Sequence, residues 1–105
     1  MTKAQTERLA LLLEELGEAQ QAIGKILRHG YGNYNPDSIG PINNKIDLQH
    51  ELGDVMFAIE LLCVEGDLDE SAIYDASVRK AQRVWKYLHH QNDVKYFQRL
   101  PSRKP

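Results

Sequence analysis

The sequence lacks the features that would stabilise a protein outside the cytoplasm or hold it in a membrane. Cys63 is its only cysteine, which excludes an internal disulfide framework and a cysteine-rich zinc site. No apolar run approaches the roughly 20 residues that a membrane-spanning helix needs. Residues 1–7 contain no apolar core of a secretory signal. We therefore expect a cytoplasmic protein without a membrane partner.

A strong net charge is also absent. The formal net charge of -2 gives no general attraction to polyanions, so we do not expect a nucleic-acid polymer as partner. A chain of 105 residues is the size of one small domain, which we place at residues 1–105. Such a domain buries a modest core for its surface, so association between copies would add stability.

What the sequence does contain is helical periodicity. Apolar residues recur at helical spacing in three stretches, as they do in amphipathic helices. The three stripes are Leu9, Leu12, Leu16, Ala19, Ile23 and Ile26; then Leu48, Leu52, Val55, Ile59 and Leu62; then Ile73, Ala76, Val84, Tyr87 and Leu88. We predict an all-α fold, a helical bundle of three main helices. A polar tail begins near residue 92 and has room for one more short helix between Val94 and Leu100.

Capping residues and turn formers delimit these helices. The candidates for the helix starts are Thr2 or Thr6, Asn43 or Asn44, and Asp67 or Asp69. The first helix is expected to end near Gly30, and residues 30–44 are rich in glycine, proline and asparagine, which predicts a loop. Tyr31 and Tyr34 either stack on a base or cover the end of the bundle. Asn44 is a substrate-selecting candidate by its position alone.

Two acidic pairs recur in nearly the same tetrapeptide, Glu15-Leu16-Gly17-Glu18 and Glu51-Leu52-Gly53-Asp54. Two acids three positions apart share one face of a helix, and both pairs flank the apolar stripe of their helix. For a single pair a solvated helix face would be the better interpretation. Two matching pairs on neighbouring helices instead predict four carboxylates in one place, where they repel one another unless a cation lies among them.

The type of donor atom in this set predicts which metal ion it binds. An all-carboxylate set suits Mg²⁺, with Mn²⁺ as the alternative, because zinc normally recruits cysteine or histidine and calcium a looped site with more oxygens. A di-iron bundle needs Glu-x-x-His pairs. None of the four histidines has a glutamate three residues before it, so we expect magnesium.

The third helix carries the opposite charge. Lys80 falls in the middle of the predicted apolar stripe and Arg83 lies one turn further along its flank. A lysine at such a position must reach solvent or meet an anion. Two interpretations stay open, a salt bridge to one of the acids and contact with substrate phosphates.

The acid pairs, followed by Lys80 and Arg83, give the chain a resemblance to the MazG-like, all-α nucleoside triphosphate pyrophosphohydrolases. The family pattern is E-E-x-x-E followed by E-x-x-D, and Glu14 supplies the additional first acid. The resemblance runs from about Leu9 to Gln91. It implies hydrolysis of a nucleoside triphosphate to the monophosphate and pyrophosphate, with a role in clearing unwanted nucleotides.

The resemblance also implies roles for single residues. The Mg²⁺ ligands would be Glu15, Glu18, Glu51 and Asp54. Lys80 and Arg83 would approach the phosphates, and Glu18 or Glu14 would be the general base. Two departures concern the substrate rather than the acids. The 32 residues between Glu18 and Glu51 exceed the family's usual spacing, and the asparagine expected before Lys80 is replaced by Ser77, Val78 and Arg79.

We further expect self-association into a homodimer or homotetramer, with Ala10, Gly17 and Gly24 as a track for close helix contact. Two other functions are compatible with the sequence. One is a non-catalytic helical interaction module that keeps the acids for metal-supported assembly. The other is a phosphoribosyl-ATP pyrophosphohydrolase.

Overall fold

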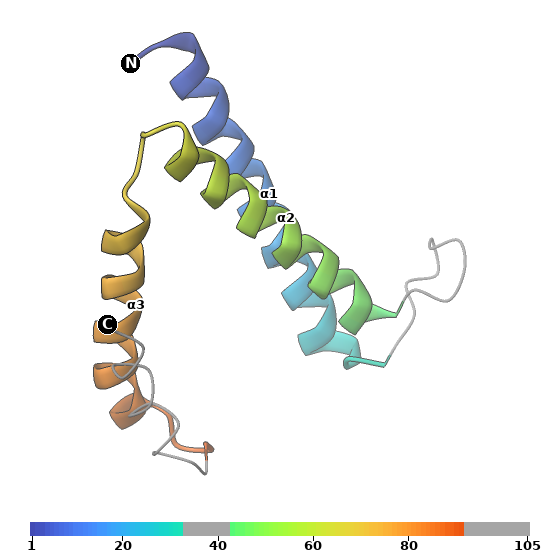
Figure 1. Cartoon of the computed structure of the whole chain (residues 1–105). Coiled ribbons are helices and arrows are strands. Elements are labelled where there is room, and N and C mark those ends of the chain that lie inside the picture. The colour runs from blue at the N-terminus through green and yellow to red at the C-terminus, as the bar shows by residue number, and fades with distance from the viewer. Residues whose placement is uncertain (33–42, 92–105) are drawn as a thin grey trace. The chain divides into compact units, whose positions relative to one another are not determined.

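The computed structural model describes residues 1–32 and 43–91, and these residues form three α-helices and one short 3-10 helix. The elements are α1 (Lys3–His29), α2 (Asn44–Val64), α3 (Glu70–Val84) and the 3-10 helix η1 (Trp85–Tyr87) (Figure 1). No strand occurs in these ranges, so the predicted all-α fold is confirmed. The helix expected between Val94 and Leu100 lies outside the described residues. The chain divides into two compact units between Leu68 and Asp69, and each is described by itself.

Each α-helix begins at a side chain that accepts a hydrogen bond from one of its first backbone N–H groups. Thr2 forms a capping box with Gln5 at the start of α1. Asn43 accepts a hydrogen bond from the backbone of α2, and Asp69 does so for α3. In each pair of predicted candidates the structure selects one. Gly30 ends α1 as predicted, with a φ of 88°, which is a conformation that glycine adopts without strain.

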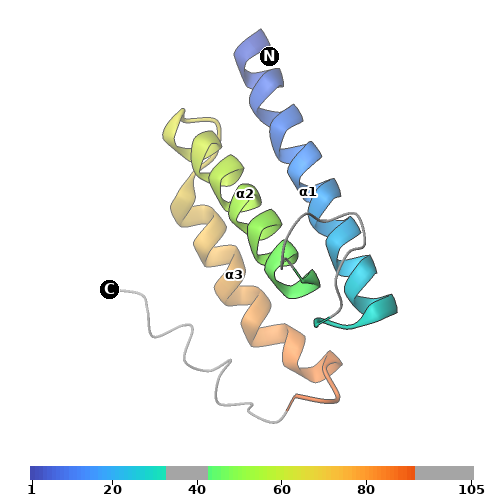
Figure 2. The ribbon, with the colours of Figure 1, turned by 90° about the vertical axis from the view of Figure 1, so that its right-hand side faces the viewer.

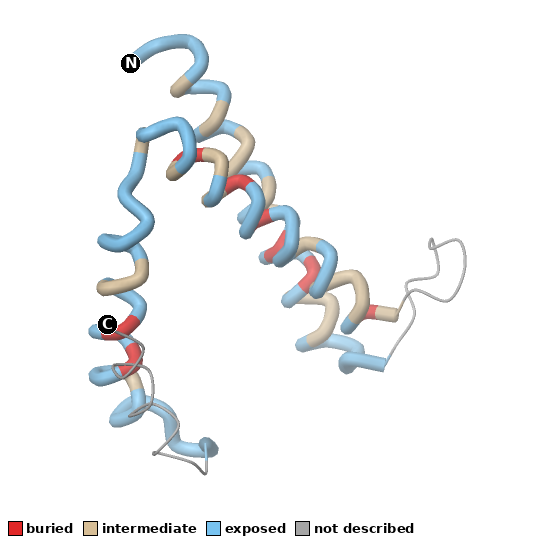
Figure 3. The backbone as a smooth tube through the Cα atoms, in the orientation of Figure 1, coloured by how far each residue is buried: buried red, intermediate tan, exposed pale blue. Residues whose placement is uncertain are grey.

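In the first unit α1 and α2 lie side by side along most of their length (Figures 1 and 2). The buried apolar residues line the seam between them (Figure 3). They are Ala19, Ala22, Val55, Ala58 and Leu62. Small alanine side chains let the two backbones approach closely, and the fully buried Leu62 adds about 1.5–3 kcal/mol of apolar burial.

Interactions at both ends hold the two helices in register. At one end, Arg8 of α1 forms a two-pronged ion pair with Asp67, just after α2, with a distance of 3.0 Å between Nη2 and Oδ1. At the other end, the buried Asn44 amide donates to the Gly30 carbonyl at 3.1 Å. The backbone N–H of Lys45 donates to the Tyr31 carbonyl at 2.9 Å.

Residues 36 positions apart occupy equivalent places on the two helices. Buried Ala19 corresponds to buried Val55, and buried Ala22 to buried Ala58. The same offset relates Glu15 to Glu51. The antiparallel pair is thus close to two-fold symmetric in its seam, and the middle of the pair is where the repeated acidic tetrapeptides meet.

Only some residues of the predicted apolar stripe of α1 pack against α2. Leu9, Leu16 and Ile23 are 43–46% exposed, whereas Ala22, outside the predicted stripe, is buried. The reason is that apolar residues cover a wide arc of α1, and one neighbouring helix buries only part of it. Leu13 and Leu27 extend the exposed part at spacings of three and four along α1.

The second unit contains α3 and η1. Its buried residues on α3 are Val78 and Ala81, whereas Ile73 and Ala76 are exposed. The predicted apolar stripe of this helix is therefore wrong at Ile73 and Ala76, although Val84 is half-buried, and exposed Lys80 does not lie in a buried stripe. None of the described helices is long and apolar enough to span a membrane.

Candidate metal centre

Four carboxylates converge at the middle of the α1–α2 pair. Glu15 and Glu18 lie on α1, and Glu51 and Asp54 lie on α2. One carboxylate oxygen from each lies within 4.8 Å of the others. The convergence predicted from the repeated tetrapeptide is therefore present in the structure, although the ligand role of these residues stays a prediction.

The four acids differ in exposure. Glu15 and Glu51 are half-buried beside the seam, and Glu18 and Asp54 are exposed at the rim. This difference follows from helix geometry, because the second acid of each pair lies about 60° further round its helix from the buried face. The centre thus has an inner pair that faces protein and an outer pair that faces solvent.

Burial and mutual repulsion perturb the inner pair. Burial is the main cause that raises the pKa of Glu15, and the charges of Glu18 and Asp54 raise it further. Burial also raises the pKa of Glu51, followed by a hydrogen bond with Glu18 and by its charge. No basic side chain in the described part of the chain forms an ion pair with these four acids.

The inner carboxylates also carry unsatisfied acceptors. Oε2 of Glu15 and Oε2 of Glu51 are buried and accept no hydrogen bond from any described residue. Buried acceptors without a partner are costly, and a cation among four carboxylates would satisfy both of them. Oxygen-only donors suit a hard divalent ion such as Mg²⁺ or Mn²⁺, so the residues fit the predicted metal.

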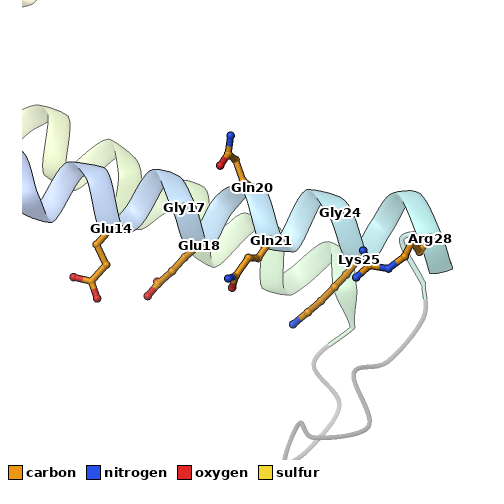
Figure 4. Close-up of a pocket in the computed structure, with 8 residues that line it drawn as sticks. All are labelled: Glu14, Gly17, Glu18, Gln20, Gln21, Gly24, Lys25 and Arg28. Atoms are coloured by element: carbon orange, nitrogen blue, oxygen red, sulfur yellow. The ribbon is translucent and has the colours of Figure 1, made fainter.

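The other predicted site residues of the first unit are not among these four carboxylates. Glu14 is exposed on α1, on the same side as Glu18 (Figure 4). Tyr31 has an exposed ring, and Tyr34 lies outside the described residues. The Asn44 amide donates a hydrogen bond to the Gly30 carbonyl, which gives this residue a structural role. Its contact with substrate stays a prediction.

Lys80 and Arg83 both lie on α3, in the second unit. Their side chains are exposed, and Nε of Arg83 donates to the Arg79 carbonyl at 3.2 Å. Both side chains are therefore accessible to an anion from solvent. Their contact with substrate phosphates stays a prediction.

A polar groove on α1 is the feature that the sequence reasoning missed. It begins at Glu14 and Glu18 and continues to Lys25 and Arg28 (Figure 4). The signal was present in the sequence, because Glu14, Glu18, Gln21, Lys25 and Arg28 alternate at spacings of four and three, as residues on one side of a helix do.

Comparison with known proteins agrees with the acid pattern. The family model of the MazG nucleotide pyrophosphohydrolase domain matches residues 3–89. The chain therefore belongs to the MazG nucleotide pyrophosphohydrolase family, as the resemblance of its acidic motifs indicated. Searches of curated proteins and of solved structures found no match.

Proposed function

We propose that this protein is a Mg²⁺-dependent nucleoside triphosphate pyrophosphohydrolase. The observation that carries the proposal is the convergence of four carboxylates, two of them with buried and unpartnered oxygens, in a chain of the MazG family. When bound, Mg²⁺ would neutralise phosphate charge and lower the pKa of water. We propose Mg²⁺ as the physiological ion and Mn²⁺ as a substitute.

The residues divide the work by their position. Glu15 and Glu51, fixed beside the seam, would anchor the ion, and Glu18 and Asp54 at the rim would complete the ligand set. Glu18 or the neighbouring Glu14 would accept the proton of the attacking water. The water oxygen forms a bond to the α-phosphorus, the bond from that phosphorus to the bridging oxygen breaks, and pyrophosphate leaves with the electron pair.

Substrate contacts beyond the acids are part of the same proposal. Lys80 and Arg83 would stabilise the charge of the phosphates, and Tyr31, Tyr34 and Asn44 would be further substrate contacts. The cellular role proposed is removal of unwanted nucleotides in the cytoplasm. No nucleic-acid polymer takes part.

We propose self-association into a homodimer or homotetramer through the exposed leucine stripe of α1. Leu9 and Leu27 lie opposite Glu18 on the helix, since residues are separated by about 100°. On α2, exposed Met56 lies nearly opposite Asp54 in the same way. A contact on this side would bury apolar surface and leave the carboxylates accessible. The track of Ala10, Gly17 and Gly24 stays the alternative contact.

The test is release of pyrophosphate from a panel of nucleoside and deoxynucleoside triphosphates with Mg²⁺, with phosphoribosyl-ATP included. Glu51→Gln should abolish release while the protein stays folded. Glu60→Gln, the same change at an exposed position of α2 outside the cluster, should leave it unchanged. Turnover of phosphoribosyl-ATP alone would redirect the assignment to that substrate. Absence of release from every compound would favour the non-catalytic interaction module.

A further inference from the structure

The groove on α1 joins the acidic centre to a cationic end. It is a largely open groove with a volume of about 720 Å³, which is within the usual range of ligand sites. Figure 4 shows the side chains of Glu18, Gln21 and Lys25 projecting from the same side of the helix. Lys25 lies seven residues beyond Glu18, or about 10 Å along the axis. One elongated ligand can therefore contact both ends of the groove.

Two glycines make room on this side of α1. A Cβ at Gly17 would have nothing within 4 Å, and a Cβ at Gly24 would meet only Nη1 of Arg28, at 3.7 Å. The guanidinium of Arg28 therefore lies back over Gly24, towards Lys25 and the acids. Glycine in a helix interior costs about 0.5–1 kcal/mol relative to alanine, and an open groove gives these two glycines a reason to be there.

The cations of the groove are available to a ligand. Neither Lys25 nor Arg28 forms an ion pair with any residue that the structure describes. The sequence pattern alone assigns no function to these two residues. They nevertheless place two positive charges beside the centre where phosphates would be held. An Arg and a Lys together suit a phosphate group, the first as a fork and the second as a point charge.

The end of α1 that carries Lys25 and Arg28 differs in charge from the equivalent end of α2. The positions 36 residues after Lys25 and Arg28 are Leu61 and Val64 on α2. At these two pairs of positions, the side chains are cationic near the end of α1 and apolar near the end of α2. A nucleoside triphosphate has the same polarity about its α-phosphorus, with pyrophosphate on one side and the nucleoside on the other.

We propose that Lys25 and Arg28 bind the β- and γ-phosphates of the substrate, and hence the departing pyrophosphate, in the groove on α1. This inference rests on the proposed function, because the metal centre fixes the α-phosphate between the two ends. It sets the direction in which the nucleotide lies. The nucleoside half then points away from Lys25 and Arg28, towards the end of α2 at Val64.

Direct binding tests this without requiring turnover. Calorimetry on the full chain at fixed Mg²⁺ would compare pyrophosphate with a panel of the four common nucleoside monophosphates. In the double variant Lys25→Ala and Arg28→Ala, the Kd of pyrophosphate should rise by about tenfold or more, since a hydrogen bond to a charged group contributes about 1.5–3 kcal/mol. The Kd of the monophosphates should change by less than about twofold.

The matched control removes the same charge elsewhere. Lys3→Ala combined with Lys45→Ala changes two exposed lysines outside the groove, and pyrophosphate binding should stay at the wild-type value. Circular dichroism should show unchanged helix content in both double variants, because the replaced side chains are not buried. A conservative Lys25→Arg should retain most of the binding.

Three outcomes distinguish failure of the groove assignment from failure of the proposed hydrolase activity. Weakened monophosphate binding with intact pyrophosphate binding would overturn the inference, because the groove would then hold the nucleoside. Unchanged binding of both ligands would overturn it as well. If the wild type binds pyrophosphate through Lys25 and Arg28 but hydrolyses no nucleotide, the inference stands and the proposed activity fails.

Discussion

Divalent metal should stabilise the α1–α2 pair, and replacement of Glu51 by glutamine should remove most of that effect. A ligand that binds only the folded state at about 100 times its Kd adds about 2.7 kcal/mol of stability. For a domain of this size, that corresponds to a rise in Tm of about 10–20 °C. The structure places all four carboxylates on one helix pair, so the gain should appear in the unfolding of that unit.

The same substitution should have the opposite effect without metal. In a chelator, wild-type protein keeps a buried, unpartnered carboxylate oxygen at Glu51, whose pKa burial raises. Glutamine carries no charge there, so Glu51→Gln should raise the Tm of the metal-free protein at neutral pH. Wild type would then be the less stable protein in chelator and the more stable one in Mg²⁺.

The dependence on pH follows from the raised pKa values of Glu15 and Glu51. A carboxyl group whose pKa is higher in the folded state binds protons more readily there, so metal-free stability rises as pH falls through the raised value. Protons then occupy the carboxylates and compete with metal. The increase in Tm caused by Mg²⁺ should therefore shrink on acidification.

The assay is thermal unfolding followed by circular dichroism, with Mg²⁺ and with chelator, at several pH values. Glu60→Gln is the control, since it replaces an exposed glutamate of α2 outside the cluster. The reasoning is refuted if Mg²⁺ raises the Tm of Glu51→Gln as much as that of wild type. It is also refuted if wild type shows no response to Mg²⁺ or Mn²⁺ at any pH.

Two further predictions concern the packing and the register of the helix pair. Leu62→Ala should lower the free energy of unfolding by about 2–5 kcal/mol, because this side chain is fully buried; chemical denaturation would measure it, and a loss below about 1 kcal/mol would contradict the packing described. The ion pair with Arg8 lowers the pKa of Asp67, so it stabilises the folded state above the ordinary pKa of Asp67 and is lost as pH falls through the lowered value. Asp67→Asn should therefore reduce stability at neutral pH and flatten its acid dependence, and an unchanged urea midpoint at both neutral and acid pH would count against the role of this pair.

The helices and the acidic cluster were accessible to sequence reasoning because their causes are local. Apolar spacing and capping side chains define a helix within a few residues. The tetrapeptide Glu15 to Glu18 recurs at Glu51 to Asp54. This repeat adds one long-range prediction, that the acids occupy equivalent positions on two helices. The carboxylates meet because antiparallel packing places equivalent positions together.

The faces that the helices bury were less accessible. Leu13, Leu16 and Leu27 are as apolar as the residues in the seam, so composition alone cannot say which part of a wide arc a single neighbour covers. On α3, the actual buried positions Val78 and Ala81 compete with an equally plausible stripe through Ile73. These choices depend on tertiary partners, which no local pattern contains. The groove has a local signal, the polar residues at spacings of four and three from Glu14 to Arg28, but such spacing is also common on solvated helix faces.

The interactions at the two ends of the helix pair have a consequence for how the chain can vary. Arg8 with Asp67, Asn44 with Gly30, and Lys45 with Tyr31 all lie outside residues 33–42. Doubling the length of a connecting stretch costs only about 0.6 kcal/mol in closure entropy. Insertions or exchanges between Gly32 and Asn43 should therefore leave the carboxylates aligned, so the length of this stretch can change without displacing the metal centre.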